Sequence, residues 1–186
     1  MAETAAPGWV SDVLKFWFEE LEPRQWFVQD LAVDALINAR FQELPDEVAA
    51  VESDVLLRDA KTALAAILVL DQFPRNLFRN TMRSFAYDGV ALQLAERAVE
   101  LGYDKALSVD ERLFLYLPFE HSEAVEDQER SVELISALDN SEYTQFAIAH
   151  RDIIARFGRF PHRNRILNRP STEEEEKFLL LPGSSF

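Results

Sequence analysis

The sequence predicts an all-α fold, an antiparallel bundle or array of about eight or nine helices. Apolar residues recur along nearly the whole chain with a period of about 3.6 residues, which is typical of amphipathic helices. Glycine is scarce, with five residues, and no Asn-Gly or Asp-Gly hairpin turn lies between alternating strand patterns. Two capping boxes, the pattern that opens helices, begin at Ser108 and Ser171. These features favour helices over strands throughout.

The first two helices are expected before Pro45. One is predicted to start after Ser11 as its N-cap and to run to Glu20, because Pro23 stops it. The second is predicted from Gln25 to Phe41, where apolar residues again follow a helical stripe.

The most hydrophobic helix is expected from about Asp54 to Phe73. Its stretch Ala63–Leu70 is apolar around the whole circumference, which is typical of the central helix of a bundle. We expect it to end at Phe73-Pro74, because the residue before a proline is pushed out of helical geometry. The preceding segment 46–53 is weakly patterned and predicts no element.

The second half of the chain carries five further helix signals, with capping residues at the starts and proline or glycine at the ends. The expected helices are Asp88 to about Leu101, followed by Gly102; Ser108 to Pro118; Ser122 to Leu138; Ser141 to Phe157, ended by Gly158; and a last helix from the Ser171 capping box to about Leu180.

Length and composition narrow the class of protein. A chain of 186 residues fits one domain, 1–186, and can bury a substantial core. Cysteine is absent, which excludes disulfides, thiolate catalysis and thiolate metal sites and fits a cytoplasmic protein. Residues 1–8 show no secretory signal. The longest apolar run has eight residues, far fewer than the roughly 20 that a membrane span needs.

Charge is distributed unevenly along the chain. The formal net charge of -14 argues against a nucleic-acid partner or an anionic membrane surface. Six arginines nevertheless lie within 151–169 beside a single acid, and three lie within 72–87 with none, whereas 120–133 holds six acids and one arginine. The simplest interpretation is that basic and acidic segments pair on folding. The alternative is that the arginines bind a carboxylate or phosphate ligand.

The first chemically dense segment surrounds Phe73-Pro74. It places Asp71 in the last turn of a buried helix, where the helix dipole disfavours an acid, so a compensating partner is required. Arg75 and Arg79 are the nearest candidates, which would make the segment a structural Asp-Arg clasp. In the functional interpretation, the turn instead directs Arg75 and Asn76 into a cleft.

The second dense segment is Glu120-His121-Ser122-Glu123 at a helix start. Its side chains could hold a cation, orient His121 as a general base, or simply cap the helix. The spacing matches no known metal-ligand motif, so the sequence assigns no metal here.

The second histidine, His150, lies in the apolar stripe of the helix Ser141–Phe157 and is therefore expected to face the core. A lone histidine there is more often a hydrogen-bonded core residue than a catalyst. The following turn, Phe157–Asn164, repeats the Phe-Pro-Arg-Asn pattern of residues 73–76 with one inserted histidine. Ligand contacts are expected from four of its side chains: Arg159, His162, Arg163 and Asn164.

Several strings together carry a family resemblance: 13–18, 70–79, 116–123, His150 with Ile153 and Ile154, 157–164, Ser171-Thr172 and Phe178-Leu179. They resemble the bacterial family catalogued as domain of unknown function 924, over nearly the whole chain. The resemblance implies an all-helical, tetratricopeptide-like fold and implies no reaction. Between Leu44 and Arg58 the chain lacks a glycine and a tryptophan that the family pattern leads one to expect.

Two functional hypotheses follow from these segments. In the first, the three histidines act as acid or base in one small-molecule site, and Asp71, Arg75, Asn76, Arg79, Glu120, Glu123 and the four residues of the 157–164 turn line it for an anionic ligand. This hypothesis requires the three imidazoles to lie together. In the second, the chain is a helical scaffold that binds a peptide or protein, and the dense segments are structural corners.

A divalent metal held by the three histidines with Glu120 or Glu123 is a third and weaker hypothesis. Arginines in the same segments would repel a cation. The sequence does not specify a cofactor or an oligomeric state.

Overall fold

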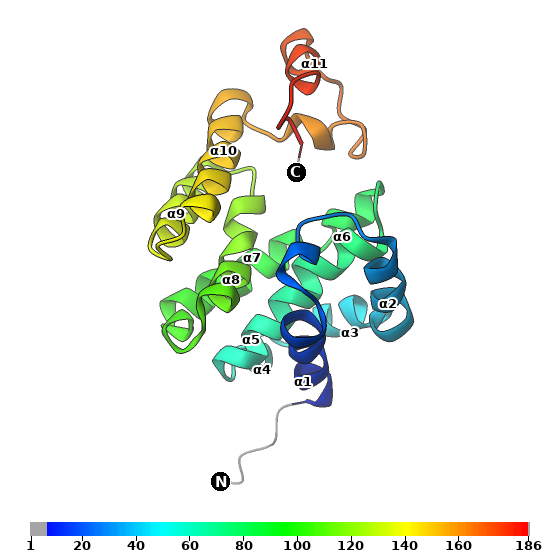
Figure 1. Cartoon of the computed structure of the whole chain (residues 1–186), viewed down its shortest axis with the longest axis vertical. Coiled ribbons are helices and arrows are strands. Elements are labelled where there is room, and N and C mark those ends of the chain that lie inside the picture. The colour runs from blue at the N-terminus through cyan, green and yellow to red at the C-terminus, as the bar shows by residue number, and fades with distance from the viewer. Residues whose placement is uncertain (1–6, 186) are drawn as a thin grey trace. The chain divides into compact units, whose positions relative to one another are not determined.

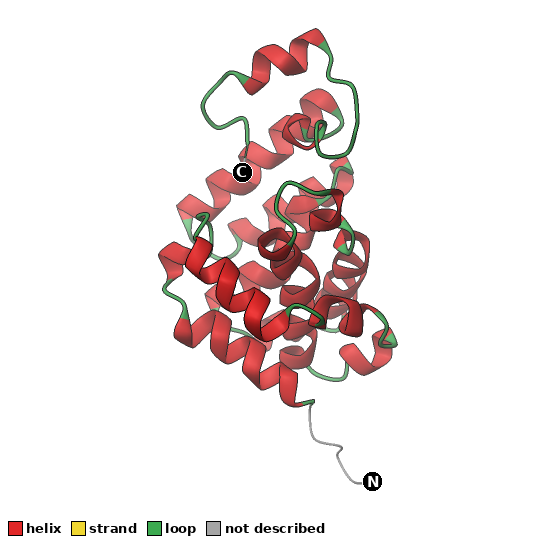
Figure 2. Ribbon diagram, turned by 90° about the vertical axis from the view of Figure 1, so that its right-hand side faces the viewer, coloured by secondary structure: helices red, strands yellow, loops and turns green. Residues whose placement is uncertain are grey.

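The computed structural model describes residues 7–185, and within that range it contains helices and no strand (Figures 1 and 2). The predicted all-α class is confirmed. Within the same range no helix is both long and apolar enough to cross a membrane. The expectation that residues 1–8 hold no signal falls mostly outside the described residues.

Eleven α-helical segments form ten rods in the described range, because a π-helical turn joins α5 to α6. The count is close to the eight or nine expected. The segments are α1 (Gly8–Lys15), α2 (Leu31–Phe41), α3 (Leu44–Ala49), α4 (Ser53–Leu56), α5 (Ala60–Ile67), α6 (Phe73–Leu77), α7 (Asp88–Glu100), α8 (Val109–His121), α9 (Val125–Ser136), α10 (Ser141–Phe157) and α11 (Glu173–Leu179).

By internal contacts the chain divides into two compact units. Unit 1 comprises 1–79 and 83–118, and unit 2 comprises 80–82 and 119–186. The last residues of α8 therefore belong to unit 2. The single-domain organisation and the tetratricopeptide-like arrangement expected from the sequence stay predictions.

Unit 1 is built around the rod of α5, η3 (Leu68–Gln72) and α6. Residues 63–70 are all fully buried, which confirms the predicted central helix. α5 packs against α1 and α7, and η3 packs against α3. Five aromatic side chains pack near the rod with ring centroids 5.1–6.3 Å apart: Phe16, Trp17, Phe41, Phe73 and Phe114. Burial of apolar surface is therefore the main stabilising term in unit 1.

The rod continues through Phe73-Pro74, where the sequence predicted its end. η3 is a π-helical turn, and Pro74 falls in the first turn of α6, where a helix needs no backbone N–H donor. The guanidinium of Arg75 also donates to the backbone carbonyl of Asp71 at 2.5 Å. Proline is tolerated because the wider π-helical turn before it shifts the pattern of helical hydrogen bonds. The helix therefore does not need a backbone N–H at Pro74.

Several predicted helix starts were wrong, and at two of them a carboxylate caps the helix instead. Ser11 lies inside α1 and donates to the carbonyl of Gly8. α2 begins at Leu31 and not at Gln25, since Asp30 accepts hydrogen bonds from the first-turn amides. Asp59 caps α5 in the same way and separates it from α4.

Two prolines expected to follow or end a helix lie within helical segments. Pro45 lies in the first turn of α3, a helix that the sequence did not predict. Pro118 lies inside α8, which continues to His121. Side chains from other elements of unit 2 cap the carbonyls at that end, as described below.

Unit 2 consists mainly of the helical hairpin of α9 and α10, followed by η6 (Pro161–Arg163) and α11. α10 has the predicted bounds, and Gly158 ends it in the left-handed region with φ 66°. The last capping box begins one residue later than expected, at Thr172 with Glu175. The apolar cluster of unit 2 is small: Ile153, Ile154 and Phe160, with Phe157 and Phe178 packed against it.

Candidate functional site

Unit 2 places two of the histidines and an arginine around one buried aromatic ring, that of Phe160. Its ring centroid lies 5.6 Å from that of His150 and 5.6 Å from that of His162. The guanidinium carbon of Arg163 lies 4.5 Å from the same centroid. We call Phe160, Glu120 and the side chains of His121, His150, His162 and Arg163 the imidazole cluster.

His150 is the most constrained member of the cluster. Its side chain is buried on α10, and Nδ1 lies 2.8 Å from the carbonyl oxygen of Phe146 and 3.3 Å from Oε1 of Glu120. A carbonyl oxygen can only accept, so the neutral imidazole must carry its proton on Nδ1. The lone pair is then on Nε2, on the opposite side of the ring.

The pKa of His150 is lowered to about 3, first by burial and then by the positive charges of His121, Arg163 and His162. The hydrogen bond to Phe146 acts in the opposite direction. The imidazole is therefore neutral at pH 7, and its 3.3 Å contact with Glu120 is not an ion pair.

His162 behaves similarly at the start of η6. Burial and then the charge of Arg163 lower its pKa to about 4, while Glu123 opposes the shift and His121 and Arg169 add to it. His121 acts on the pKa values of both His150 and His162, and His162 also acts on that of His150. That the three imidazoles line one ligand site stays a prediction.

Glu123 and Arg169 hold the turn that carries Phe160. Arg169 donates to both carboxylate oxygens of Glu123 at 2.6 and 3.0 Å and to the carbonyl of Phe160 at 3.1 Å. The backbone N–H of Phe160 donates to Glu123 at 2.8 Å. Burial would raise the pKa of Glu123, but these bonds outweigh it and lower that pKa. Glu123 therefore fixes the backbone of the turn at Phe160. Its partner, Arg169, was not among the candidate site residues predicted from the sequence.

Arg159 and Asn164, expected to touch a ligand, have partners in the segment that follows the turn. Arg159 donates to both oxygens of Glu175 at 2.6 and 2.8 Å, and this pairing lowers the pKa of Glu175 to about 2. Asn164 is 1% exposed, donates to Ser171 and accepts from Arg169. The expected pairing of the basic segment 151–169 with the acidic segment 120–133 occurs at Arg169 with Glu123 and at Arg151 with Glu129.

The first Phe-Pro segment forms an ion-pair network in unit 1. Arg75 donates to both oxygens of Asp88 at 2.9 and 3.0 Å, and its Nη1 lies 3.4 Å from the fully buried carboxylate of Asp71. Burial acts to lower the pKa of Arg75, but Asp71 and Asp88 raise it overall. The predicted Asp-Arg clasp is therefore present, with Asp88 as an additional partner.

Asn76 and Arg79 share a second acid, Asp34 on α2. Asn76 donates to Asp34 at 2.8 Å, and Arg79 donates to both of its oxygens at 2.7 and 2.8 Å. Asp34 lies more than forty positions earlier in the chain, and no local pattern marks it as the partner. The first Phe-Pro segment belongs to unit 1 and the second to unit 2.

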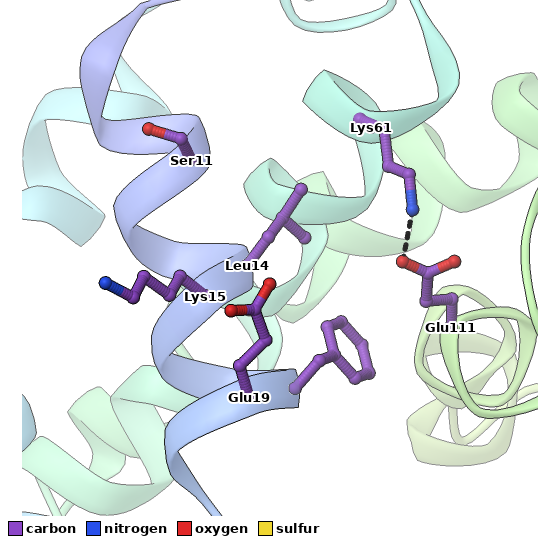
Figure 3. A pocket seen from close by; sticks show the side chains of 7 residues that line it. Ser11, Leu14, Lys15, Glu19, Lys61 and Glu111 are labelled. Carbon is purple, nitrogen blue, oxygen red and sulfur yellow. Dashed lines mark hydrogen bonds and ion pairs between the residues drawn. The ribbon is translucent and has the colours of Figure 1, made fainter.

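Unit 1 also carries two open hollows. One, of about 440 Å³, is lined by Ser11, Leu14, Lys15, Phe18, Glu19, Lys61 and Glu111; Figure 3 shows Lys61 paired with Glu111. The second, of about 340 Å³, shares Phe18 and Glu111 and adds Pro23, Trp26, Ser108 and Asp110. Neither hollow contains a histidine.

Among residues 7–185 no group of three His, Asp or Glu side chains is arranged to hold a metal ion. The charges around the imidazole cluster also disfavour a cation. Arg163 and Arg169 lower the pKa of His162, so additional positive charge is unfavourable there. The geometry therefore offers no support to the metal hypothesis.

Fold and site together define an all-helical protein in which two neutral imidazoles, His150 and His162, pack with Arg163 around a buried phenylalanine. Residues 13–183 match the family described as bacterial protein of unknown function DUF924, and the chain belongs to that family. A solved structure of a protein of unknown function from Agrobacterium tumefaciens is similar, with 43% identity and a TM-score of 0.87 over 92% of this chain and 96% of that one. No curated protein matches the chain.

Proposed function

We propose that the imidazole cluster of unit 2 binds a small anionic ligand, a carboxylate or a phosphate. The observation that carries the proposal is the gathering of His150, His162 and Arg163 around Phe160, with His121 near enough to act on the pKa values of both imidazoles. The proposed contact residues are therefore fewer than the sequence suggested, because Arg159, Asn164 and Glu123 have partners that build the turn.

Electrostatics supports an anion over a cation. Burial is the largest cause of the lowered pKa values of His150 and His162, and the positive charge of Arg163 lowers both further, so Arg163 contributes a positive potential at both rings. The side chains of His150 and Arg163 are mostly buried, and in partly desolvated surroundings an opposite charge is attracted more strongly than in water. An anion would relieve this potential, and a guanidinium suits its oxygens.

The Glu120–His150 arrangement also suits proton transfer. The Nδ1–H of His150 is oriented by two acceptors, which leaves the Nε2 lone pair as a hydrogen-bond acceptor or base. A bound anion would raise the pKa of this imidazole toward neutrality. On this basis His150 is our candidate for acid-base chemistry if the site is enzymatic.

Histidine NMR spectroscopy tests the proposal directly, because the chain contains only three histidines. The imidazole signals are assigned with the variants His121→Gln, His150→Gln and His162→Gln. The protein is then titrated with inorganic phosphate and, separately, with succinate. We expect saturable shifts of the His150 and His162 signals with at least one of them.

Two controls separate a site from a general response to anions. Arg151→Gln removes one positive charge from α10 at a residue paired with Asp152 and Glu129, and it should leave the titration unchanged. Arg163→Lys should weaken binding, since a lysine loses the planar guanidinium. If neither phosphate nor succinate moves the two signals, the proposal is wrong.

A binding scaffold is the second candidate function, and one observation favours it. In unit 1 the hollow lined by Phe18, Pro23 and Trp26 is near in sequence to three exposed apolar side chains: Phe27 at 58%, Val28 at 57% and Leu31 at 73%. Apolar side chains grouped in this way suit a peptide or protein partner. Phe27→Ser with Leu31→Ser should abolish capture of that partner without moving the histidine signals.

We also infer a cytoplasmic location and no nucleic-acid partner. These inferences rest on the complete absence of cysteine and on the net charge of -14.

A further inference from the structure

The C-terminal end of α8 is capped by side chains from other elements. The last carbonyls of an α-helix have no partner within the helix. Nε2 of Gln128, on α9, lies 2.6 Å from the carbonyl oxygen of Glu120, 2.8 Å from that of Ser122 and 3.4 Å from that of Phe119. The remaining carbonyl in this stretch, that of His121, accepts from Nη1 of Arg163 at 3.0 Å.

These contacts determine the orientation of the Gln128 amide. Three carbonyl oxygens face it, and only the –NH₂ group can donate to them, so the reversed amide would bring oxygen against oxygen. The side chain is fully buried, and Oε1 has no hydrogen-bond partner among the described residues. A buried acceptor left in this state is destabilising. An apolar side chain would avoid that cost but could not cap the helix.

The capped turn is the one that presents Glu120 to His150. The shortest Gln128 contact is to the backbone of Glu120 itself, and the carboxylate of the same residue lies 3.3 Å from Nδ1 of His150. Glu120 is 5% exposed, so its side chain has little freedom once its backbone is fixed. The position of that carboxylate helps to keep the imidazole proton on Nδ1.

We propose that Gln128 is a positioning residue of the imidazole cluster: it fixes the last turn of α8 and thereby holds Glu120 against Nδ1 of His150. The importance of Gln128 for ligand binding rests on the proposed function. The structural claim, that Gln128 holds Glu120 against His150, can be tested without a ligand. Ser131 offers a matched control, since it is one turn along the same face of α9, is fully buried and makes no hydrogen bond to α8 among the described residues.

The test compares Gln128→Met with Ser131→Ala by imidazole ¹⁵N chemical shifts at pH 7, which report the tautomer. We expect Gln128→Met to move the His150 nitrogens toward a mixture of the two tautomers and to weaken phosphate or succinate binding about tenfold. Ser131→Ala should leave both readouts unchanged. If Gln128→Met does not fold, Gln128→Asn, which keeps the amide but shortens its reach, is expected to shift the tautomer in the same direction.

The outcomes separate the two proposals. Unchanged His150 nitrogen shifts in the folded Gln128 variant would overturn the positioning role, whatever the protein binds. Equal changes in the Ser131 variant would also overturn it, because they would show a general response of α9. A tautomer shift in a protein that binds neither phosphate nor succinate would support the positioning role and refute the anion site.

Discussion

The two Phe-Pro segments begin alike and differ in what they gather. In both, the phenylalanine is fully buried and the proline lies in the first turn of a short helix, at Phe73-Pro74 and Phe160-Pro161. In unit 1 the following Arg75 pairs with Asp88 and approaches Asp71. In unit 2 the equivalent Arg163 donates to the backbone carbonyl of His121 and lies over the Phe160 ring.

This difference separates a structural corner from a candidate site. A guanidinium between carboxylates is neutralised and contributes to stability. A guanidinium that caps carbonyls keeps its positive charge beside buried imidazoles, and its effect is seen in the lowered pKa values of His150 and His162. The chemistry of a Phe-Pro segment therefore depends on which acidic side chains pack against its arginine.

The largest expected effect is on stability in unit 1. Arg75→Met should lower the free energy of unfolding by about 3–5 kcal/mol, because it deprives the fully buried carboxylate of Asp71 of its positively charged neighbour. Urea denaturation followed by circular dichroism measures the loss. A loss below about 1 kcal/mol would show that Arg75 is not what compensates that charge.

The next effect is a dependence of stability on pH. The pKa values of His150 and His162, about 3 and about 4, lie below the ordinary 6.5. As the pH falls below 6.5, the unfolded chain binds protons that the folded protein does not, so the free energy of unfolding should fall. Each histidine contributes up to about 1.4 kcal/mol per pH unit, and the effect is absent above pH 7.5.

Denaturation at pH 7.5, 6 and 5 isolates the histidines. Glu123 and Glu175, whose pKa values are lowered from 4.5, lose their stabilising contribution only as the pH falls below about that value. His162→Gln should reduce the slope between pH 6 and 5. A slope that is the same in this variant would mean that His162 is protonated in the folded protein.

Arg163→Met should cost less than Arg75→Met, about 1.5–3 kcal/mol, because it removes a charge-assisted hydrogen bond to the His121 carbonyl. It should also raise the pKa values of His150 and His162, since the positive charge that lowers them is gone. Denaturation and histidine NMR titration measure the two effects. A cost equal to that of Arg75→Met would remove the distinction between the two segments.

The smallest effects are expected at exposed ion pairs. Arg97→Gln in unit 1 and Arg130→Gln in unit 2 each break a pair to a glutamate three residues later, at arginines that are 60% and 43% exposed. Each should change the free energy of unfolding by less than about 0.5 kcal/mol. These variants calibrate the larger losses, and a cost above 1 kcal/mol in either would show that charge loss alone destabilises the protein.

The sequence indicated where the chemistry lies better than it indicated each residue's role. Histidines and arginines in short segments indicated the ends of α8 and α10, and the structure brings His150, His162 and Arg163 together around Phe160 there. A ligand was expected at Arg159 and Asn164 because the capping box that contains Ser171 predicts a helix start and does not link Glu175 or Ser171 to these two side chains. Gln128 went unnoticed because a glutamine in an acidic helix resembles a solvent-facing residue.

By itself, the sequence determined the helical class, the buried central rod and the bounds of α10, since these follow from periodicity, apolar run length and local capping chemistry. Only the tertiary structure decided which acid each arginine meets, that Pro74 and Pro118 lie within continuous helices, and that Gln128 caps α8 beside the Glu120–His150 pair. Those outcomes depend on contacts between distant residues, such as the 42 positions that separate Arg163 from His121. Local patterns do not encode such contacts, because the same side chain can be satisfied by any partner that the fold brings within reach.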